Sequence, residues 1–395
     1  MTAAAKPSRA SRVPRPKLSM PESKRGKILV GLIVAAFFYA LPLLNLPIIT
    51  TPDSDFSGVL FTMAIYAIVA LGLNIVVGYA GLLDLGYVGF YAIGAYVVAV
   101  LTSAHASLPY FLVVPIAVIL AMVSGVLLGA PTLRVRGDYL AIVTLGFGEI
   151  IRLTAVNSDW LGGARGISKI PPPTSIPPET VDGLFEVPHL EWDGVIPSVD
   201  WDTTTKVLKF GVLDAIPYYW LALTVVIIVL FADTLIKDSR VGRAWEATRE
   251  DEDAAEIMGV PTFRYKLLAF AMGAFVGGLA GSLFAARQGF VSPQSFQLLL
   301  SMLFVAAVVV GGQGNRWGVI IGAALVVYLP ERFRGFADFR VLIFGMALML
   351  LAIYRPQGIL PPRRTKRAQA MQAELEALEE GADEEQHELE HKLNG

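Results

Sequence analysis

Long uninterrupted blocks of apolar residues constrain this chain more than any other feature of its sequence. The blocks run for about 17–24 residues, which is the length that an α-helix needs to cross about 30 Å of hydrocarbon. A membrane β-barrel would show short segments of alternating polarity instead. Aliphatic and aromatic residues fill 54% of the 395 positions, and charged residues fill only 17%. The sequence therefore predicts an all-α integral membrane protein, a polytopic helical bundle in the lipid bilayer.

The apolar blocks predict about ten transmembrane helices, of which the last three are short. The expected spans are Ile28–Ile49, Val59–Gly78, Tyr87–Thr102, Tyr110–Ala130, Tyr139–Val156, Tyr218–Ile236, Leu267–Ala286, Leu298–Gly311, Gly318–Leu329 and Val341–Ile353. They form a transmembrane domain of residues 28–362, between a basic arm at 1–27 and an acidic tail at 363–395.

Basic residues indicate the orientation of the bundle. With ten spans, the Lys and Arg clusters of the N-terminal arm, Arg134/Arg136, Lys237–Lys266 and Arg355–Arg367 all fall on one side of the membrane. Because basic loops stay in the cytoplasm, both termini are expected to be cytoplasmic. The Pro- and Gly-rich segment 157–217 then lies outside, where its composition predicts turns and short helices.

The segment Lys237–Lys266 is a strongly charged stretch between two apolar blocks. Its acidic residues alternate with small apolar ones, which predicts one or two short helices, and Gly259 followed by Pro261 is a strong helix stop. A segment of this kind has no role inside a membrane. It is either a docking surface for a soluble partner or a solvated loop between helices.

Two glycine-rich stretches interrupt apolar blocks, at Val76–Asp84 and Val309–Asn315. A helix that breaks at membrane depth exposes backbone amides and carbonyls, which can bind a zwitterion or line a translocation path. The alternative is that both stretches are simple interfacial turns. The candidate path residues in them are Gly78, Gly81, Asp84, Gly311, Gly312 and Gln313.

Glu149 and Arg152 are the ionisable residues placed deepest in an apolar run. Their i,i+3 spacing places them on one face of a helix. Glu149 follows Asp138 by about 16 Å of helix, past the middle of the membrane. A charge at that depth must face protein or water, so the pair is either a salt bridge that holds two helices or part of a polar translocation path.

Several classes of function are excluded or poorly supported. The chain has no cysteine, which excludes disulfides, thiol catalysis and Cys-ligated metals. Its four histidines fall in loops or in the tail, so a membrane-embedded enzyme with a metal site is not expected. It also lacks a Gly-x-x-x-x-Gly-Lys-Ser/Thr loop for nucleotide phosphates. Nothing in the sequence indicates nucleic-acid binding.

Six motifs, in order, resemble one known family. They are Gly72–Gly78 with Gly81–Tyr87, Leu133–Ile150, Gly163–Ile167, Gly242–Ala247 with Arg249–Asp251, Phe284–Pro293 and Tyr354–Gly358. The family is the LivM-type permease subunit of ABC importers for branched-chain amino acids, and the resemblance covers about Leu71 to Pro362.

The resemblance implies a role and a set of partners. The chain would be a transport subunit of the bacterial inner membrane, in a heterodimer with a second permease subunit. Two cytoplasmic ATP-binding subunits would hold ATP and Mg, so this chain would need no cofactor and would not be an enzyme. An extracytoplasmic solute-binding protein would deliver leucine, isoleucine or valine.

Candidate residues for coupling to the ATPase follow from the same resemblance. They are Arg243, Trp245, Glu246, Ala247, Arg249, Glu250, Asp251 and Gly259. Urea or short amides are alternative cargoes within the same class. A different class, an ion-coupled secondary transporter, would need a midplane carboxylate, for which Asp84 and Glu149 are the candidates.

Overall fold

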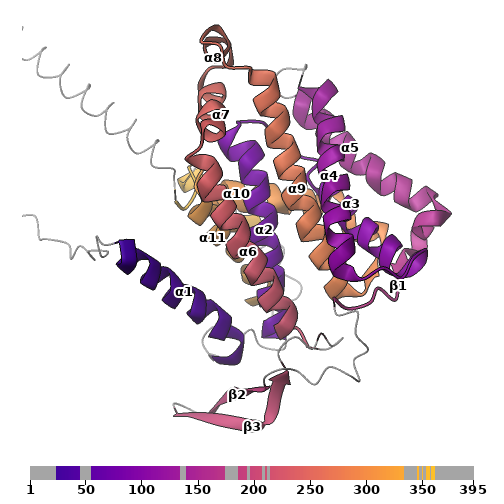
Figure 1. The fold of residues 1–395 in the computed structure, drawn as a ribbon, viewed down its shortest axis with the longest axis vertical. Coiled ribbons are helices and arrows are strands. Elements are labelled where there is room, and N and C mark those ends of the chain that lie inside the picture. Colours follow the sequence, from indigo (N-terminus) through magenta and orange to yellow (C-terminus); the bar gives the residue numbers. More distant parts are fainter. Residues whose placement is uncertain are drawn as a thin grey trace, which may run out of the picture.

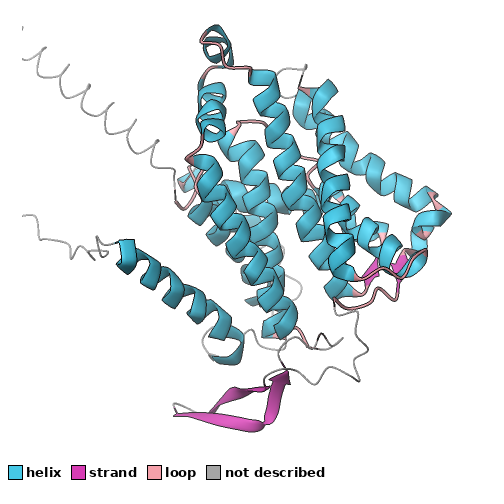
Figure 2. Cartoon of the chain, viewed as in Figure 1, coloured by secondary structure: helices cyan, strands magenta, loops and turns pink. Residues whose placement is uncertain are grey.

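A computed structural model shows the chain as a bundle of helices with two small antiparallel sheets (Figures 1 and 2). The structure describes residues 24–44, 55–133, 139–173, 186–193, 196–206, 210, 214–332, 345–346, 349, 353–355 and 357–360. The basic arm up to residue 23 and the acidic tail lie outside these residues.

The predicted all-α membrane fold is confirmed. The α-helices are α1 Lys24–Leu44, α2 Phe56–Leu73, α3 Val88–Ala99, α4 Tyr110–Thr132, α5 Tyr139–Asn157, α6 Ile216–Lys237, α7 Arg240–Glu250, α8 Glu252–Ile257, α9 Thr262–Gln288, α10 Leu298–Gly311 and α11 Arg316–Arg332. Among the described residues, six helical segments are long and apolar enough to cross a membrane: those containing α2, α4, α5, α6, α9 and α10. The first nine expected spans each overlap a described helix, whereas Val341–Ile353 lies largely outside the described residues.

Helices α2 and α9 organise the bundle. Helix α9 packs against α2, α3, α4 and α6, and α2 packs in addition against α10 and α11 (Figure 1). Small residues permit these contacts: a Cβ on Gly94 of α3 would lie 2.1 Å from the carbonyl oxygen of Gly278 in α9. Such close backbone approach is how helices associate specifically when lipid is as apolar as their side chains. Gly94 and Gly278 therefore form part of a helix-packing surface.

The two ends of the bundle carry different structural elements. One end carries α7 and α8, and we call it the α7/α8 end (Figure 1). The opposite end, the hairpin end, carries the pair β1 (Ile167–Ser168) with β4 (Phe290–Val291), and the antiparallel hairpin of β2 (Glu186–Asp193) with β3 (Ile196–Lys206). The expected turns are present as two 3₁₀ turns at Asp159–Leu161 and Gly163–Arg165, but the β2–β3 hairpin was not predicted.

The helical path ends after α2, within the glycine-rich stretch that predicted either a broken helix or an interfacial turn. Helix α2 ends in a π-helical turn, Asn74–Tyr79, and the backbone then stays non-helical until α3 begins at Val88. This segment returns into the bundle, because Ser301, near the start of α10, donates to the carbonyl oxygen of Leu85 at 2.5 Å. Irregular backbone at membrane depth is tolerated only where protein or a polar path surrounds it.

Candidate functional site

Helix α7 is joined to the membrane-spanning helix α6 by a rigid corner. The Ser239 hydroxyl caps α7 by accepting from the backbone amide of Val241 at 3.1 Å, and it donates to the Ile236 carbonyl of α6 at 2.6 Å. Gly242 lies so close to the end of α6 that a Cβ would meet the Lys237 carbonyl oxygen at 2.3 Å. A displacement of α7 must therefore move the last turn of α6.

Trp245 anchors α7 to α9. The indole is completely buried, and its Nε1 donates to the carbonyl oxygen of Tyr265 at 2.7 Å. Ala244 and Thr248, four positions apart on α7, are also buried, and Thr248 follows Trp245 by three positions. An ion pair between Lys266 and Glu252 links α8 to α9 in the same region. The predicted coupling residue Trp245 thus faces the interior.

Other predicted coupling residues lie on the outer face of α7 or in the joint to α8. Arg243, Glu246 and Glu250 are exposed. Asp251 caps α8 by accepting from the backbone amide of Ala254 at 2.9 Å, so it defines the angle between the two helices. Ala247 is half-buried on α7.

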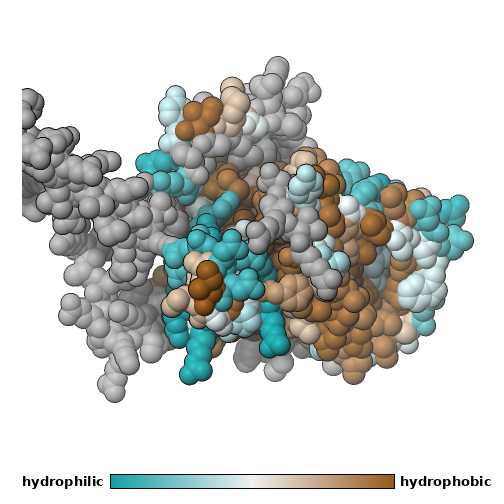
Figure 3. Space-filling view, turned by 90° about the horizontal axis from the view of Figure 1, so that it is seen from above, coloured by the Kyte–Doolittle hydropathy of each residue, from teal (hydrophilic) through white to brown (hydrophobic). Residues whose placement is uncertain are grey.

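The tip of α8 presents apolar side chains to solvent. Ile257 is 85% exposed and Met258 is 83% exposed. Gly259 follows with a φ of +85°, which turns the chain back toward α9. Hydrophilic side chains gather over this end of the molecule, and hydrophobic surface lies to their right in the view from above (Figure 3). Two large apolar side chains in a polar surface are typical of a protein contact.

A partly buried polar cluster lies where α6, the π-helical turn and the α10–α11 turn meet. Asp233 of α6 accepts from the Tyr79 hydroxyl at 3.0 Å and lies 3.8 Å from Nη1 of Arg316. Lys237 donates to the carbonyl oxygen of Gly314 at 3.2 Å. The Gly314 amide in turn donates to Oδ1 of Asn74 at 2.8 Å. We call Asn74, Tyr79, Asp233, Lys237, Gly314 and Arg316 the α6 cluster.

Two of the predicted path residues contact the predicted coupling segment directly. Nη1 of Arg249 donates to the carbonyl oxygen of Gly78, at the end of the π-helical turn. Gly81 has a φ of +73°, and a Cβ there would lie 2.7 Å from Cγ of Arg249. The structure therefore joins α7 to the first helix break.

Asp84 lies deeper, in the non-helical segment before α3. Its side chain is completely buried, and Oδ1 accepts from the Gly86 amide at 2.9 Å. Oδ2 has no hydrogen-bond partner among the described residues. Thr144 of α5 packs beside it and accepts from the Leu85 amide at 3.1 Å. Asp84 thus lies against α5.

The second glycine-rich stretch forms a tight turn against the chain near residue 360. A Cβ on Gly311 would lie 2.2 Å from the carbonyl oxygen of Gly318, and Gly312 has a φ of +110°. The backbone amide of Leu360 donates to the carbonyl oxygen of Gly311 at 3.1 Å. Gln313 is half-buried beside this turn. The stretch holds α10, α11 and residues 357–360 together at the α7/α8 end.

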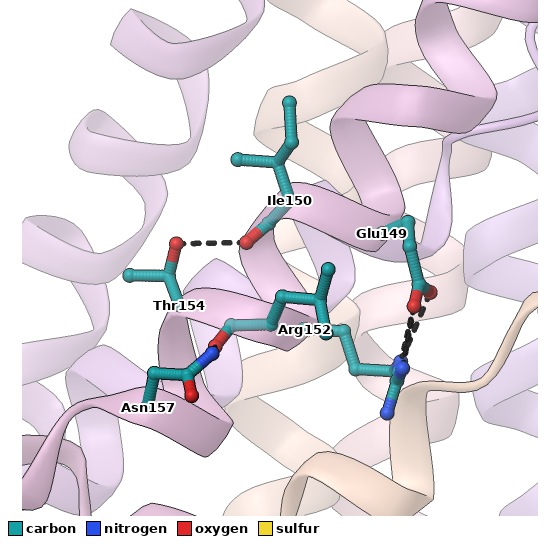
Figure 4. Close-up of polar contacts among 6 residues, drawn as sticks. Glu149, Ile150, Arg152, Thr154 and Asn157 are labelled. Atoms are coloured by element: carbon teal, nitrogen blue, oxygen red, sulfur yellow. Dashed lines mark hydrogen bonds and ion pairs between the residues drawn. The ribbon is translucent and has the colours of Figure 1, made fainter.

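Glu149 and Arg152 form an ion pair within α5, at 2.5 Å between Oε1 and Nη2 (Figure 4). Both partners of this ion pair lie on α5, and the two expectations for it, a salt bridge between helices or part of a polar path, stay predictions. The Arg152 side chain is 26% exposed and that of Glu149 is 40% exposed, although both lie near the middle of the helix.

The hairpin end contains a cavity of about 370 Å³ between α2, α10 and α11. Its lining includes Asp55, Thr62, Tyr66, Leu303 and Glu331. None of the predicted path residues lines it. Within the described ranges, the structure has no group of three or more side chains that suits a metal ion.

Comparison with known proteins identifies the family. Residues 56–353 match the family model for the branched-chain amino acid transport system / permease component. The chain belongs to this family. It is 46% identical over 304 residues to the high-affinity branched-chain amino acid transport system permease protein LivM of Escherichia coli (strain K12), an alignment that covers 76% of this chain and 68% of that protein.

More distant relatives support the same assignment. The probable branched-chain amino acid transport permease protein LivM of Methanocaldococcus jannaschii is 24% identical over 358 residues, covering 78% of this chain and 93% of the relative. The permease protein LivH of Escherichia coli (strain K12) is 31% identical over 133 residues, covering 32% of this chain and 41% of LivH. No solved structure matches the chain. The LivM-type resemblance of the sequence is thus confirmed.

The candidate site includes residues that the sequence analysis missed. Asp233 and Arg316 were not among the candidates, although both are central to the α6 cluster. Asp233 could have been found, because a carboxylate near the end of an apolar helix is costly in a membrane unless it has a partner. Arg316 gave no such signal, since it begins a helix next to a glycine-rich turn.

Proposed function

We propose that this permease subunit imports leucine, isoleucine and valine as one half of the translocation path of an ATP-driven ABC importer. The observation that carries the proposal is the α7/α8 end, where exposed apolar and acidic side chains sit on two short helices anchored to the membrane-spanning bundle. An ATP-binding subunit would receive the tip of α8 in a groove, as proteins commonly receive short amphipathic helices. The partner subunits would hold ATP and Mg.

The charges of the two ends support the orientation. Basic residues of the α7/α8 end include Lys237, Arg240, Arg243, Arg249, Arg264, Lys266 and Arg316. By the positive-inside rule this end is cytoplasmic, where ATP is available. The hairpin end then faces outward, toward a solute-binding protein. Helix α1 would start on the cytoplasmic side, because α2 starts at the hairpin end.

The exposed ion pair of α5 supports a polar neighbour in the membrane. Glu149 and Arg152 are partly exposed in this single chain, near the middle of a 19-residue helix. An ion pair at that depth is strongly disfavoured against lipid. We therefore place the second permease subunit, or the translocation path between the two subunits, against this face of α5. Alternating access would open the path to either side as the ATPase pair closes and separates.

Uptake in cells tests the proposed function. A strain without this gene should lose accumulation of radiolabelled leucine, isoleucine and valine, and a plasmid copy should restore it. Depletion of ATP should abolish the restored uptake, whereas dissipation of the ion gradients at constant ATP should leave it. A plasmid copy that restores uptake of urea or a short amide but not of leucine would contradict the proposed cargo. Loss of uptake when the ion gradients are dissipated at constant ATP would favour a secondary transporter.

A further inference from the structure

The α6 cluster joins three structural elements that a moving permease must coordinate. Asp233 and Lys237 lie in the last turns of α6, directly before the rigid corner to α7. Tyr79 belongs to the π-helical turn that ends α2, and Arg316 begins α11. Side-chain contacts therefore run from α6 to both helix breaks of the bundle.

The hydrogen bonds of the cluster are incomplete in this conformation. Oδ1 of Asp233, Nδ2 of Asn74 and Nη1 of Arg316 are buried and have no hydrogen-bond partner among the described residues. Buried polar atoms without partners are rare, because each has lost its hydrogen bonds to water and gained none in the protein, which costs free energy. Three such atoms in one cluster indicate that the groups find better partners in another arrangement, or that water completes them.

The distance between Asp233 and Arg316 indicates how small the rearrangement is. Oδ2 and Nη1 are 3.8 Å apart. A charge-assisted hydrogen bond between such groups is about 2.7–2.9 Å long. An approach of about 1 Å would thus convert a loose ion pair into a direct bond. Because α6 carries Asp233 and is rigidly joined to α7, a shift of α7 by that amount is sufficient.

We propose that Asp233 and Arg316 form a latch that passes the movement of α7 to the α10–α11 turn and the π-helical turn. This inference rests on the proposed role of α7 and α8 as the ATPase contact. Both side chains are positioning residues, since they act through the helices that they join. When the ATPase subunits close, α7 moves, the latch tightens, and the two helix breaks move together. Without the latch, ATP hydrolysis continues, but the two helix breaks no longer move with α7 and the translocation path does not respond.

The test measures how many leucine molecules are transported for each ATP hydrolysed. The complete importer is reconstituted in proteoliposomes with wild-type chain, Asp233→Asn, Arg316→Gln or Arg316→Lys, at equal amounts of assembled complex. We expect both neutral variants to hydrolyse ATP at near wild-type basal rate, with a leucine-to-ATP ratio about tenfold lower. A tenfold change corresponds to about 1.4 kcal/mol in the free-energy difference between two conformations. Arg316→Lys keeps the charge and should recover much of the ratio.

Tyr79→Phe is the variant for the case in which loss of a buried charge prevents folding. It removes only the hydroxyl that donates to Asp233, and the ring remains under Lys237. Its matched control is Tyr219→Phe, which removes a buried hydroxyl that donates to the Phe38 carbonyl at 2.9 Å, near the hairpin end. We expect Tyr79→Phe to lower the ratio and Tyr219→Phe to leave it unchanged.

Two results would overturn the latch. One is a wild-type leucine-to-ATP ratio both in Tyr79→Phe and, separately, in any neutral variant that assembles. The other is an equal fall in Tyr79→Phe and Tyr219→Phe, which would show a general effect of lost hydroxyls. A wild-type complex that hydrolyses ATP but does not transport leucine would refute the proposed cargo instead. The latch would then be judged by whether the solute-binding protein still stimulates ATP hydrolysis in the variants.

Discussion

Replacing Trp245 by alanine should detach the α7–α8 unit from the bundle. The indole is completely buried between α7 and α9, and its Nε1 donates to the Tyr265 carbonyl at 2.7 Å. Truncation of a buried tryptophan costs about 3–5 kcal/mol. Loss of the hydrogen bond adds about 1 kcal/mol. The sum is a large fraction of the roughly 5–15 kcal/mol by which a typical domain is stable.

Trp245→Phe separates the two contributions. The phenyl ring keeps most of the apolar contact and loses the hydrogen bond, so the expected cost falls to about 1–2 kcal/mol. The assay is the thermal unfolding midpoint of the purified chain in detergent, together with the amount of ATPase subunit that co-purifies. We expect the midpoint and the co-purification to fall strongly for Trp245→Ala and weakly for Trp245→Phe.

A matched variant at the tip of α8 should behave differently. Ile257 and Met258 are 85% and 83% exposed, so Ile257→Ala with Met258→Ala removes little packing within the chain. The thermal midpoint should stay at the wild-type value while ATPase co-purification falls. The reasoning would be refuted if Trp245→Ala left the midpoint unchanged, or if the tip variant lowered the midpoint as much as Trp245→Ala does.

Two further predictions concern the helix break and the α5 ion pair. Gly81→Ala adds a Cβ that would lie 2.7 Å from Cγ of Arg249 at a φ of +73°, whereas Gly259→Ala meets nothing within 4 Å at a φ of +85°. Both variants bear the cost of about 1–2 kcal/mol for a side chain in the left-handed backbone region. A greater loss of leucine uptake in Gly81→Ala than in Gly259→Ala therefore reports the contact with Arg249. Equal losses would argue against a role for that contact. Arg152→Gln should lower the yield of assembled permease more than Glu149→Gln with Arg152→Gln does, because the single change leaves a carboxylate without its partner in the membrane. A double variant that assembles fully yet transports nothing would instead assign the pair to the translocation path.

The sequence predicted those parts of the fold that depend on local chemistry. Apolar blocks of membrane-spanning length located the helices, since few other structures satisfy the backbone in lipid. The glycine-rich stretch after α2 predicted either a broken helix or an interfacial turn, and the structure has a non-helical segment between Tyr79 and Val88. The charged segment before α9 predicted one or two short helices with a stop at Gly259, and the structure has two, α7 and α8.

The features that the sequence did not predict depend on packing between distant segments. Trp245 was expected among the contacts to a partner, but only the position of α9 decides which face of α7 is buried. Asp233 and Arg316 are 83 positions apart in the chain, and their meeting depends on how α6 and α11 pack around α2. The β2–β3 hairpin lies in a segment whose prolines and glycines favoured turns over strands.

ATP-driven accumulation of leucine in proteoliposomes tests the central claim most directly. The chain is reconstituted with a LivH-type permease subunit, two ATP-binding subunits and a solute-binding protein, with ATP supplied on the side of α7 and α8. We expect leucine, isoleucine and valine to accumulate against a gradient only when ATP and the solute-binding protein are both present, and the double tip variant Ile257→Ala with Met258→Ala to abolish the accumulation. Accumulation that proceeds without ATP, or that survives the tip variant unchanged, would contradict the account.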